Sequence, residues 1–145
     1  MVYLDFERSK IKYLEAQRMY DQVLSDKEGL FSMTQPKGTA YDGDVVTGGH
    51  PQNTFDMYLI KQEFEQIDIK IMEMKSLIDE RKHLMDIQEE RLRKSKALVD
   101  RIYLMKYLEC RRVSEIAWKV SYSESQVYRI LDRIQQTCKE MRKML

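Results

Sequence analysis

The chain has little proline, glycine or cysteine, and the first shortage bears directly on its fold. Only 2 prolines and 5 glycines occur among 145 residues, and all seven lie between residues 25 and 54. The long stretches on either side therefore lack the residues that most often end helices. Together with a 34% content of charged side chains, this composition predicts a soluble, mostly helical protein with one domain or two small ones.

Metal-binding and catalytic patterns are also missing from the sequence. Cys110 and Cys138 belong to no Cys-x-x-Cys or Cys/His pattern, and the two histidines, His50 and His83, stand far apart. Structural zinc sites and nucleophilic catalysis need such side chains at defined spacings. We therefore expect reduced, structural cysteines, no metal, no cofactor and no enzymatic activity.

Long apolar runs are absent as well. No run approaches the length of about 18 residues that a membrane-spanning helix needs, and the N-terminal segment MVYLDFERSK is charged from its fifth residue. This pattern fits neither a signal peptide nor a membrane anchor. We expect a cytoplasmic protein with no membrane partner.

Charge, by contrast, is plentiful and unevenly distributed. Residues 1–80 carry 9 basic and 15 acidic side chains, whereas residues 81–145 carry 16 basic and 9 acidic ones. Neutralisation of phosphates by basic side chains is the main source of affinity for DNA. The basic half is therefore the part of the chain that we expect to meet nucleic acid.

The acidic half predicts two helices and a connector. Residues 3–24 place Leu4, Ile11 and Leu14 on one face of a helix. Residues 25–54 hold every glycine and proline, so we expect a connector there. Asn53 or Thr54 should then cap a long helix.

The long helix carries an apolar heptad pattern that predicts helix–helix packing. Its apolar residues alternate at spacings of three and four, and they form the heptad stripe of Met57, Ile60, Phe64, Ile67, Ile71, Met74 and Ile78. A single helix cannot bury such a stripe. We expect it to pack on residues 3–24 and on a second copy of the chain, which favours a homo-oligomer; an intramolecular helical hairpin in a monomer is the alternative.

Residues 113–132, VSEIAWKVSYSESQVYRILD, have the pattern of a helix-turn-helix. Ile116, Ala117 and Val120 form the buried stripe of a short first helix. Ser121-Tyr122 is the turn, where one residue often takes a positive φ and glycine is usual.

In the second helix of this motif, Ser123 is the expected N-cap. The buried stripe of that helix is Val127, Ile130, Leu131 and Ile134. Its other face would enter the major groove of DNA. The residues that we expect to contact DNA are Arg112, Lys119, Tyr122, Ser123, Glu124, Ser125, Gln126, Tyr128, Arg129 and Arg133. The same spacing also fits a plain pair of antiparallel helices in a bundle that binds no DNA.

A third helix should complete this DNA-binding unit. The apolar pattern restarts at Ala97, with Leu98, Ile102, Met105 and Leu108 on one face. We therefore expect an all-α protein in which residues 1–96 form the N-terminal helix, connector and long coiled-coil-type helix. Residues 97–145 would form a tri-helical helix-turn-helix domain.

The segment LVDRIYLMKYLECRRVSEIAWKVSYSESQVYRILDRI resembles the C-terminal unit of the RinA/ArpU-like phage transcriptional regulators, which is itself similar to region 4 of bacterial sigma factors. The matching motifs are Tyr107-Leu108, Glu115-Ile116-Ala117, Tyr122-Ser123 and Gln126-Val127-Tyr128-Arg129. The family commonly has a glycine where this chain has Glu109-Cys110 and another where it has Ser121.

The resemblance implies a cytoplasmic protein of a bacterial host that binds double-stranded DNA and controls phage or prophage late genes, such as packaging or lysis genes. Two other functions fit the same pattern. One is a small terminase-like DNA-packaging protein, which would assemble as a ring. The other is a protein-interaction module that engages RNA polymerase through its surface. The sequence does not choose between an activator and a repressor.

Overall fold

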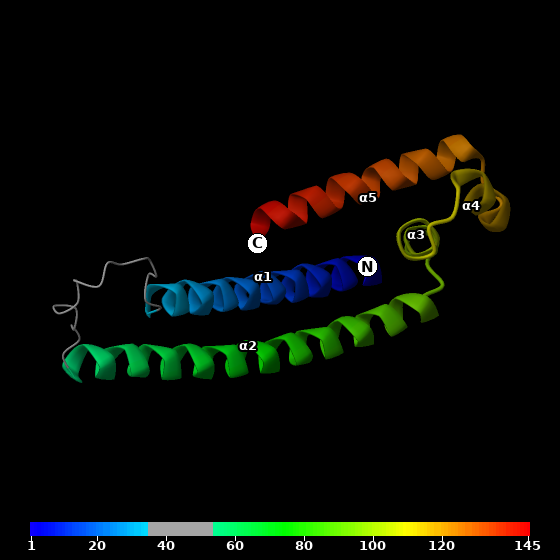
Figure 1. Ribbon diagram of the computed structural model, residues 1–145. Coiled ribbons are helices and arrows are strands. Elements are labelled where there is room, and N and C mark those ends of the chain that lie inside the picture. The colour runs from blue at the N-terminus through cyan, green and yellow to red at the C-terminus, as the bar shows by residue number, and fades with distance from the viewer. Residues whose placement is uncertain (35–53) are drawn as a thin grey trace. The chain divides into compact units, whose positions relative to one another are not determined.

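The structure, a computed structural model, describes residues 1–34 and 54–145, and every regular element in these two ranges is helical (Figure 1). This confirms the predicted all-α class for the part of the chain that is described. The elements are α1 (Val2–Thr34), α2 (Thr54–Lys94), α3 (Leu98–Tyr103), the π-helical segment η2 (Leu104–Leu108), α4 (Val113–Val120) and α5 (Glu124–Met144).

The packing divides the chain into two compact units. Unit 1 comprises residues 1–13 and 80–145, and unit 2 comprises residues 14–79. The first turns of α1 and the last turns of α2 thus pack with the C-terminal helices, because Tyr3, Phe6 and Leu92 are buried in their core. The predicted domain boundary at residue 96 stays a prediction. The contacts place residues 80–96 and residues 97–145 together in unit 1.

Helix α1 is longer than the sequence pattern predicts. The prediction of a connector from residue 25 is wrong for residues 25–34, which continue the helix to Thr34. Gly29 costs a helix only about 1 kcal/mol relative to alanine. The ion pair from Lys27 to Asp68 and the partly buried Leu24 and Leu30 give this stretch tertiary support that a local pattern does not reveal. The remainder of the predicted connector, residues 35–53, lies outside the described residues.

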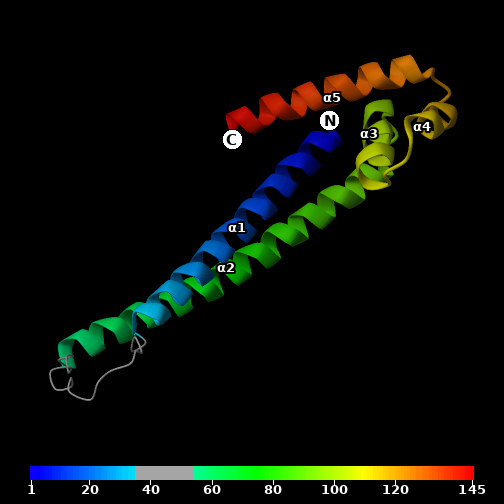
Figure 2. The same ribbon diagram turned by 45° about the horizontal axis from the view of Figure 1, so that its top comes forward.

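Unit 2 is a helical hairpin in which α1 and α2 lie side by side (Figures 1 and 2). Ala16 is fully buried, and its small side chain allows the two helices to approach closely. The Lys27 ammonium lies 2.8 Å from a carboxylate oxygen of Asp68 on the facing helix. The predicted packing of the N-terminal helix against the long helix is therefore confirmed.

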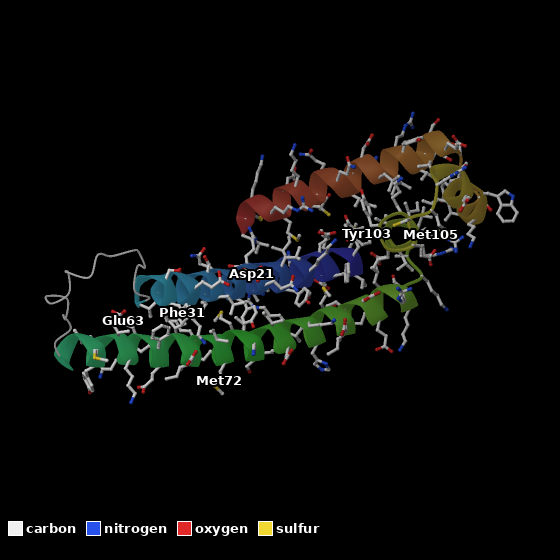
Figure 3. All side chains as sticks on the ribbon, viewed as in Figure 1. Asp21, Phe31, Glu63, Met72, Tyr103 and Met105 are labelled. Carbon is white, nitrogen blue, oxygen red and sulfur yellow. The ribbon has the colours of Figure 1, made fainter. Side chains whose placement is uncertain are left out.

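The heptad stripe is only partly covered by this hairpin. Ile71 is buried, whereas Met57 is 62% exposed. The other five stripe residues are half-buried: Ile60, Phe64, Ile67, Met74 and Ile78. Outside the stripe, Ile69 is 56% exposed and Met72 is 71% exposed. Met72 projects from the side of α2 that faces away from α1 (Figure 3). A second apolar surface therefore remains open on α2.

Unit 1 has a continuous apolar core to which five segments of the chain contribute. The core residues are Tyr3, Phe6, Leu92, Ile102, Tyr103, Met105, Val113, Ile116, Ala117, Val120, Val127, Leu131, Ile134 and Cys138. The predicted third helix is confirmed as α3 and η2, since Ile102 and Met105 are buried and Leu98 and Leu108 are partly buried. The expected tri-helical arrangement is thus present, with parts of α1 and α2 added to it.

A buried carboxylate attaches the start of α1 to this core. The backbone N–H of Tyr3 donates to Oδ1 of Asp100 at 3.1 Å, and the Ser95 hydroxyl donates to Oδ2 of the same residue at 2.7 Å. Asp100 is only 2% exposed. The first N–H groups of a helix lack partners within the helix and attract negative charge. Asp100 supplies both the acceptor and the charge from a distant part of the sequence.

The segment after α3 ends in a wide turn. The N–H of Glu109 donates to the carbonyl of Leu104 at 3.0 Å, and that of Arg111 donates to the carbonyl of Met105 at 2.9 Å. Cys110 takes a left-handed conformation with φ of 53°. This turn ends the helix and directs the chain into α4.

Candidate nucleic-acid interface

Helix α4 is short and strongly two-sided. Ile116 is fully buried, and Ala117 and Val120 are buried as predicted, together with Val113. These four residues lie on one face because a helix repeats every 3.6 residues. The face packs against α5, so α4 holds the second helix in place.

The turn between α4 and α5 has the geometry that a helix-turn-helix requires. Ser121 lies in the left-handed region with φ of 61° and ψ of 40°, and its N–H donates to the carbonyl of Ala117. The N–H of Tyr122 donates to that carbonyl as well, at 3.1 Å. The prediction of a positive φ in this turn is confirmed, although serine pays a steric cost there that glycine does not.

The start of α5 is fixed by a capping box. The Ser123 hydroxyl accepts a hydrogen bond from the N–H of Gln126 at 3.2 Å, and Oε1 of Gln126 accepts one from the N–H of Ser123 at 3.0 Å. Two N–H groups at the helix start are thereby satisfied. Ser123 is the N-cap, as the sequence predicts. Gln126 is one of the residues expected to contact DNA, and its side chain also caps the helix.

Helix α5 buries one stripe and exposes the opposite face. Val127, Leu131 and Ile134 are buried and Ile130 is partly buried, in agreement with the predicted stripe. Ser125, Arg129 and Arg133 follow one another at intervals of four residues, so they line the outward side of the helix. This is the side that would meet base edges if α5 entered a major groove.

All ten residues predicted to contact DNA are exposed. Eight of them lie on the turn and the first turns of α5: Tyr122, Ser123, Glu124, Ser125, Gln126, Tyr128, Arg129 and Arg133. Arg112 is the N-cap of α4 and Lys119 lies in its last turn. The structure thus gathers eight residues on one continuous segment and places two on the neighbouring helix. Their contact with DNA stays a prediction.

Trp118 is a surface residue that the sequence patterns above do not predict. The only tryptophan of the chain is 82% exposed on α4. A shallow groove beside it is lined by Arg111, Ser114, Glu115 and Lys119. Its position between buried Ala117 and exposed Lys119 in the helical repeat could have identified it, because an indole on the outer face of a helix has no core to fill.

Comparison with family models, with curated proteins and with solved structures finds no match for this chain. Within residues 1–34 and 54–145, the helices do not combine the length and apolar character that a bilayer span requires. The geometry and charge of unit 1 are therefore the features of the molecule that bear on its function.

Proposed function

We propose that this protein is a sequence-specific transcriptional regulator that binds double-stranded DNA with α5 in the major groove. The observation that supports this proposal most strongly is the geometry of the turn between α4 and α5. A left-handed Ser121, the Ser123 cap and the buried stripe hold α5 so that Ser125 and Arg129 point outward. A helix presented in this way can read base edges, whereas a plain helical hairpin needs neither the sharp turn nor an outward arginine.

The charge of unit 1 supports the same proposal. Residues 81–145 carry 16 basic and 9 acidic side chains, and all of them belong to unit 1. Their positive balance would attract the phosphate backbone before any base is read. The acidic remainder of the chain makes nonspecific binding through unit 2 unfavourable.

The direct test is binding of the full chain to labelled random duplex, followed by fluorescence anisotropy between about 50 and 200 mM salt. Each neutralised phosphate contributes about −0.9 to the slope of log K against log salt. We expect a steep negative slope. A flat salt dependence, or no binding at low salt, would contradict the proposal.

The resemblance to RinA/ArpU-like regulators extends the proposal to phage or prophage late genes in the cytoplasm of a bacterial host. Footprinting on fragments of the protein's own genome tests this extension. Protection upstream of packaging or lysis genes is the expected result. Uniform binding along all fragments would contradict a regulatory target, although it would agree with DNA binding.

We also propose that the protein acts as a homo-oligomer, with a dimer favoured. The support is the apolar surface of α2 that α1 leaves open, above all Met57, Ile69 and Met72. Exposed apolar residues at this density on a helix indicate a contact surface. Two recognition helices in a symmetric dimer would reach two half-sites about 34–36 Å apart.

A second candidate function is favoured by Trp118. Tryptophan and arginine are enriched among the residues that dominate protein–protein affinity, and the exposed indole lies beside Arg111. A protein-interaction module engaging RNA polymerase would use this surface. Fluorescence anisotropy of the dye-labelled chain titrated with purified RNA polymerase tests it, with Trp118→Ala as the comparison. Equal affinities of the two chains would exclude a contribution from this side chain.

A further inference from the structure

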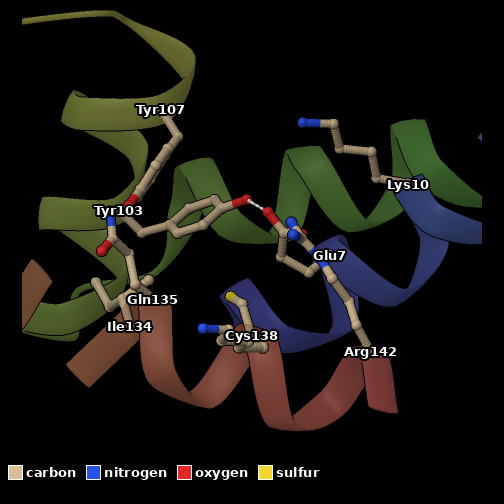
Figure 4. Close-up of a pocket in the computed structure, with 9 residues that line it drawn as sticks. Glu7, Lys10, Tyr103, Tyr107, Ile134, Gln135, Cys138 and Arg142 are labelled. Carbon is tan, nitrogen blue, oxygen red and sulfur yellow. Dashed lines mark hydrogen bonds and ion pairs between the residues drawn. The ribbon is translucent and has the colours of Figure 1, made fainter. Parts of the chain in front are cut away.

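A groove in unit 1 lies outside the residues assigned to DNA contact. It is enclosed by the first turns of α1, the segment from α3 to η2, and the second half of α5 (Figure 4). Its volume is about 430 Å³. Small-molecule sites in proteins occupy roughly 300–1,000 Å³, so the groove has the size of a ligand site.

The floor of the groove is apolar and one wall is aromatic. Tyr103, Ile134 and Cys138 are buried beneath it. The ring of Tyr107 lies 4.9 Å from that of Tyr103, centroid to centroid, and is tilted by 38°. Tyr107 is 40% exposed and lines the groove, so a ligand there can reach this residue.

The rim of the groove is basic. Lys10 from α1 and Arg142 from α5 lie at its edge (Figure 4), and Lys139 from α5 also lines it. Within the described part of the chain, neither Lys10 nor Lys139 forms an ion pair. Two lysines from separate helices therefore line the groove without a carboxylate partner, and their positive charge attracts an anion.

The one carboxylate in the groove is already partnered. The Glu7 side chain is 8% exposed and lies 3.7 Å from the Arg142 guanidinium. It also accepts a hydrogen bond from the hydroxyl of Tyr103 (Figure 4). Burial, and then the hydrogen bond with Glu7, raise the pKa of Tyr103, so this hydroxyl keeps its proton. Glu7 therefore repels an anion less than an unpaired carboxylate would. Its remaining lone pairs can accept a hydrogen bond from a ligand N–H.

We propose that this groove binds a small anion that joins a planar ring to a phosphate, of which a nucleoside monophosphate is the simplest example. The ring would lie against Tyr107, and an amino group on it would donate to Glu7. The phosphate would lie between Lys10 and Lys139. This inference depends on the groove alone and stands whether or not α5 reads DNA.

Isothermal titration of the full chain with adenosine 5′-monophosphate at about 0.15 M salt tests the proposal. We expect one site per chain with a dissociation constant of about 1 mM or below. Adenosine alone and inorganic phosphate alone should each bind at least about tenfold more weakly, because each meets half of the groove. Absence of saturable binding up to about 10 mM nucleotide would overturn the proposal.

Variants of the groove residues test whether the nucleotide binds in the groove. Lys139→Glu and Tyr107→Ala should each weaken binding at least about tenfold. Lys143 also lies on α5 but does not line the groove, so Lys143→Glu is a control with the same change of charge. The affinity of this variant for the nucleotide should stay within about twofold of the wild-type value. Melting curves identify any variant that fails to fold. An equal loss in Lys143→Glu and Lys139→Glu would reduce the effect to general electrostatics and refute a built site.

A competition arm distinguishes a free nucleotide from a DNA phosphate, since both carry the same chemistry. Saturating random duplex should leave the affinity for adenosine 5′-monophosphate unchanged. Displacement of the nucleotide by duplex would assign the groove to the DNA interface and overturn the proposal of a separate small-molecule site.

Discussion

At the scale of single residues, two side chains stand where backbone geometry favours glycine. Cys110 has φ of 53° and Ser121 has φ of 61°. Residues with a Cβ lose about 1–2 kcal/mol in the left-handed region. Both residues follow the end of a helix and redirect the chain. The turns are therefore held by surrounding packing against a local preference.

We predict that Ser121→Gly stabilises the protein by about 0.5–1 kcal/mol, because relief of the left-handed strain exceeds the entropy that glycine adds to the unfolded chain. Urea denaturation followed by circular dichroism measures the change. Ser114→Gly is the matched control, since Ser114 is exposed in the first turn of right-handed α4. That variant should lose about 0.5–1 kcal/mol. A destabilised Ser121→Gly would mean that the turn differs from the one described.

A second prediction concerns alkaline pH. Burial, followed by the hydrogen bond with Glu7, raises the pKa of Tyr103 above its ordinary value of 10.0. Burial also raises the pKa of Cys138 above 9.0. Groups that keep their protons in the folded state but lose them in the unfolded state contribute stability that declines as pH rises. The urea midpoint should therefore fall as pH passes from about 9 to above 10.

Tyr103→Phe separates the contributions of the two groups. It removes the phenol, so the loss of stability above about pH 10 should become smaller, while the decline that starts near pH 9 persists. At neutral pH the variant should lose about 1–3 kcal/mol, because the buried carboxylate of Glu7 loses a donor. An unchanged alkaline profile in Tyr103→Phe would contradict a protonated Tyr103 in the folded state.

At the scale of the elements, α5 has two different halves. Its first turns carry the cap and the outward residues Ser125 and Arg129. Its second half buries Cys138 and Met141 and pairs Arg142 with Glu7 of α1. The helix is 21 residues long, or about 30 Å at 1.5 Å per residue. It thus joins the proposed DNA face to the groove through one rigid element.

We predict that Arg129→Ala lowers affinity for the footprinted site by about 1–3 kcal/mol and affinity for random duplex by less, if the side chain reads a base. Anisotropy titrations on both duplexes measure the difference. Lys143→Ala removes the same charge near the far end of α5 and should change both affinities little. Equal losses on the two duplexes would show a phosphate contact, and no loss would exclude this part of α5 from the groove.

At the scale of the whole molecule, apolar surface and charge are distributed differently between the units. Unit 1 contains the basic segment from residue 81 onward and a closed apolar core. Unit 2 leaves apolar side chains exposed, among them Leu14, Phe31 and Met72. This distribution agrees with the proposed binding of DNA by unit 1 and of a second copy of the chain by unit 2.

We predict that Met72→Asp converts an oligomer to a monomer at micromolar concentration while leaving the helix content unchanged. Met72 is 71% exposed, so the variant removes little contact within the chain. A charge in a dimer interface without a partner is strongly unfavourable. Sedimentation equilibrium measures the mass, and Gln66→Asp, at an exposed polar position of the same helix, is the control.

The wild-type mass decides between the proposed assemblies. A dimer agrees with the regulator, and a monomer refutes the oligomer. A particle of about eight or more subunits would favour the ring expected of a small terminase-like packaging protein. Phe64→Asp is the less selective variant, because Phe64 is half-buried within unit 2 and its loss would also disturb the hairpin.

Local patterns were sufficient to predict the helix-turn-helix. The buried positions of α4 and α5, the Ser123 cap and the positive φ of the turn all depend on residues within a few positions of one another. Helical periodicity and capping hydrogen bonds act over that range, so both can be predicted from the sequence. The exposure of the ten predicted DNA-binding residues follows from the same periodicity.

Only the tertiary structure decided what depends on distant partners. Asp100 meets the N–H of Tyr3 across 97 positions, and Tyr103 meets Glu7 across 96. The ion pair from Lys27 to Asp68 joins α1 to α2 just before Gly29. These contacts have no repeat and no spacing rule, because the polar groups meet their partners only once separate segments of the chain have packed together. The sequence by itself therefore determined which helices form and which faces they bury, and packing alone decided that the start of α1 completes the core of unit 1 and lines the groove.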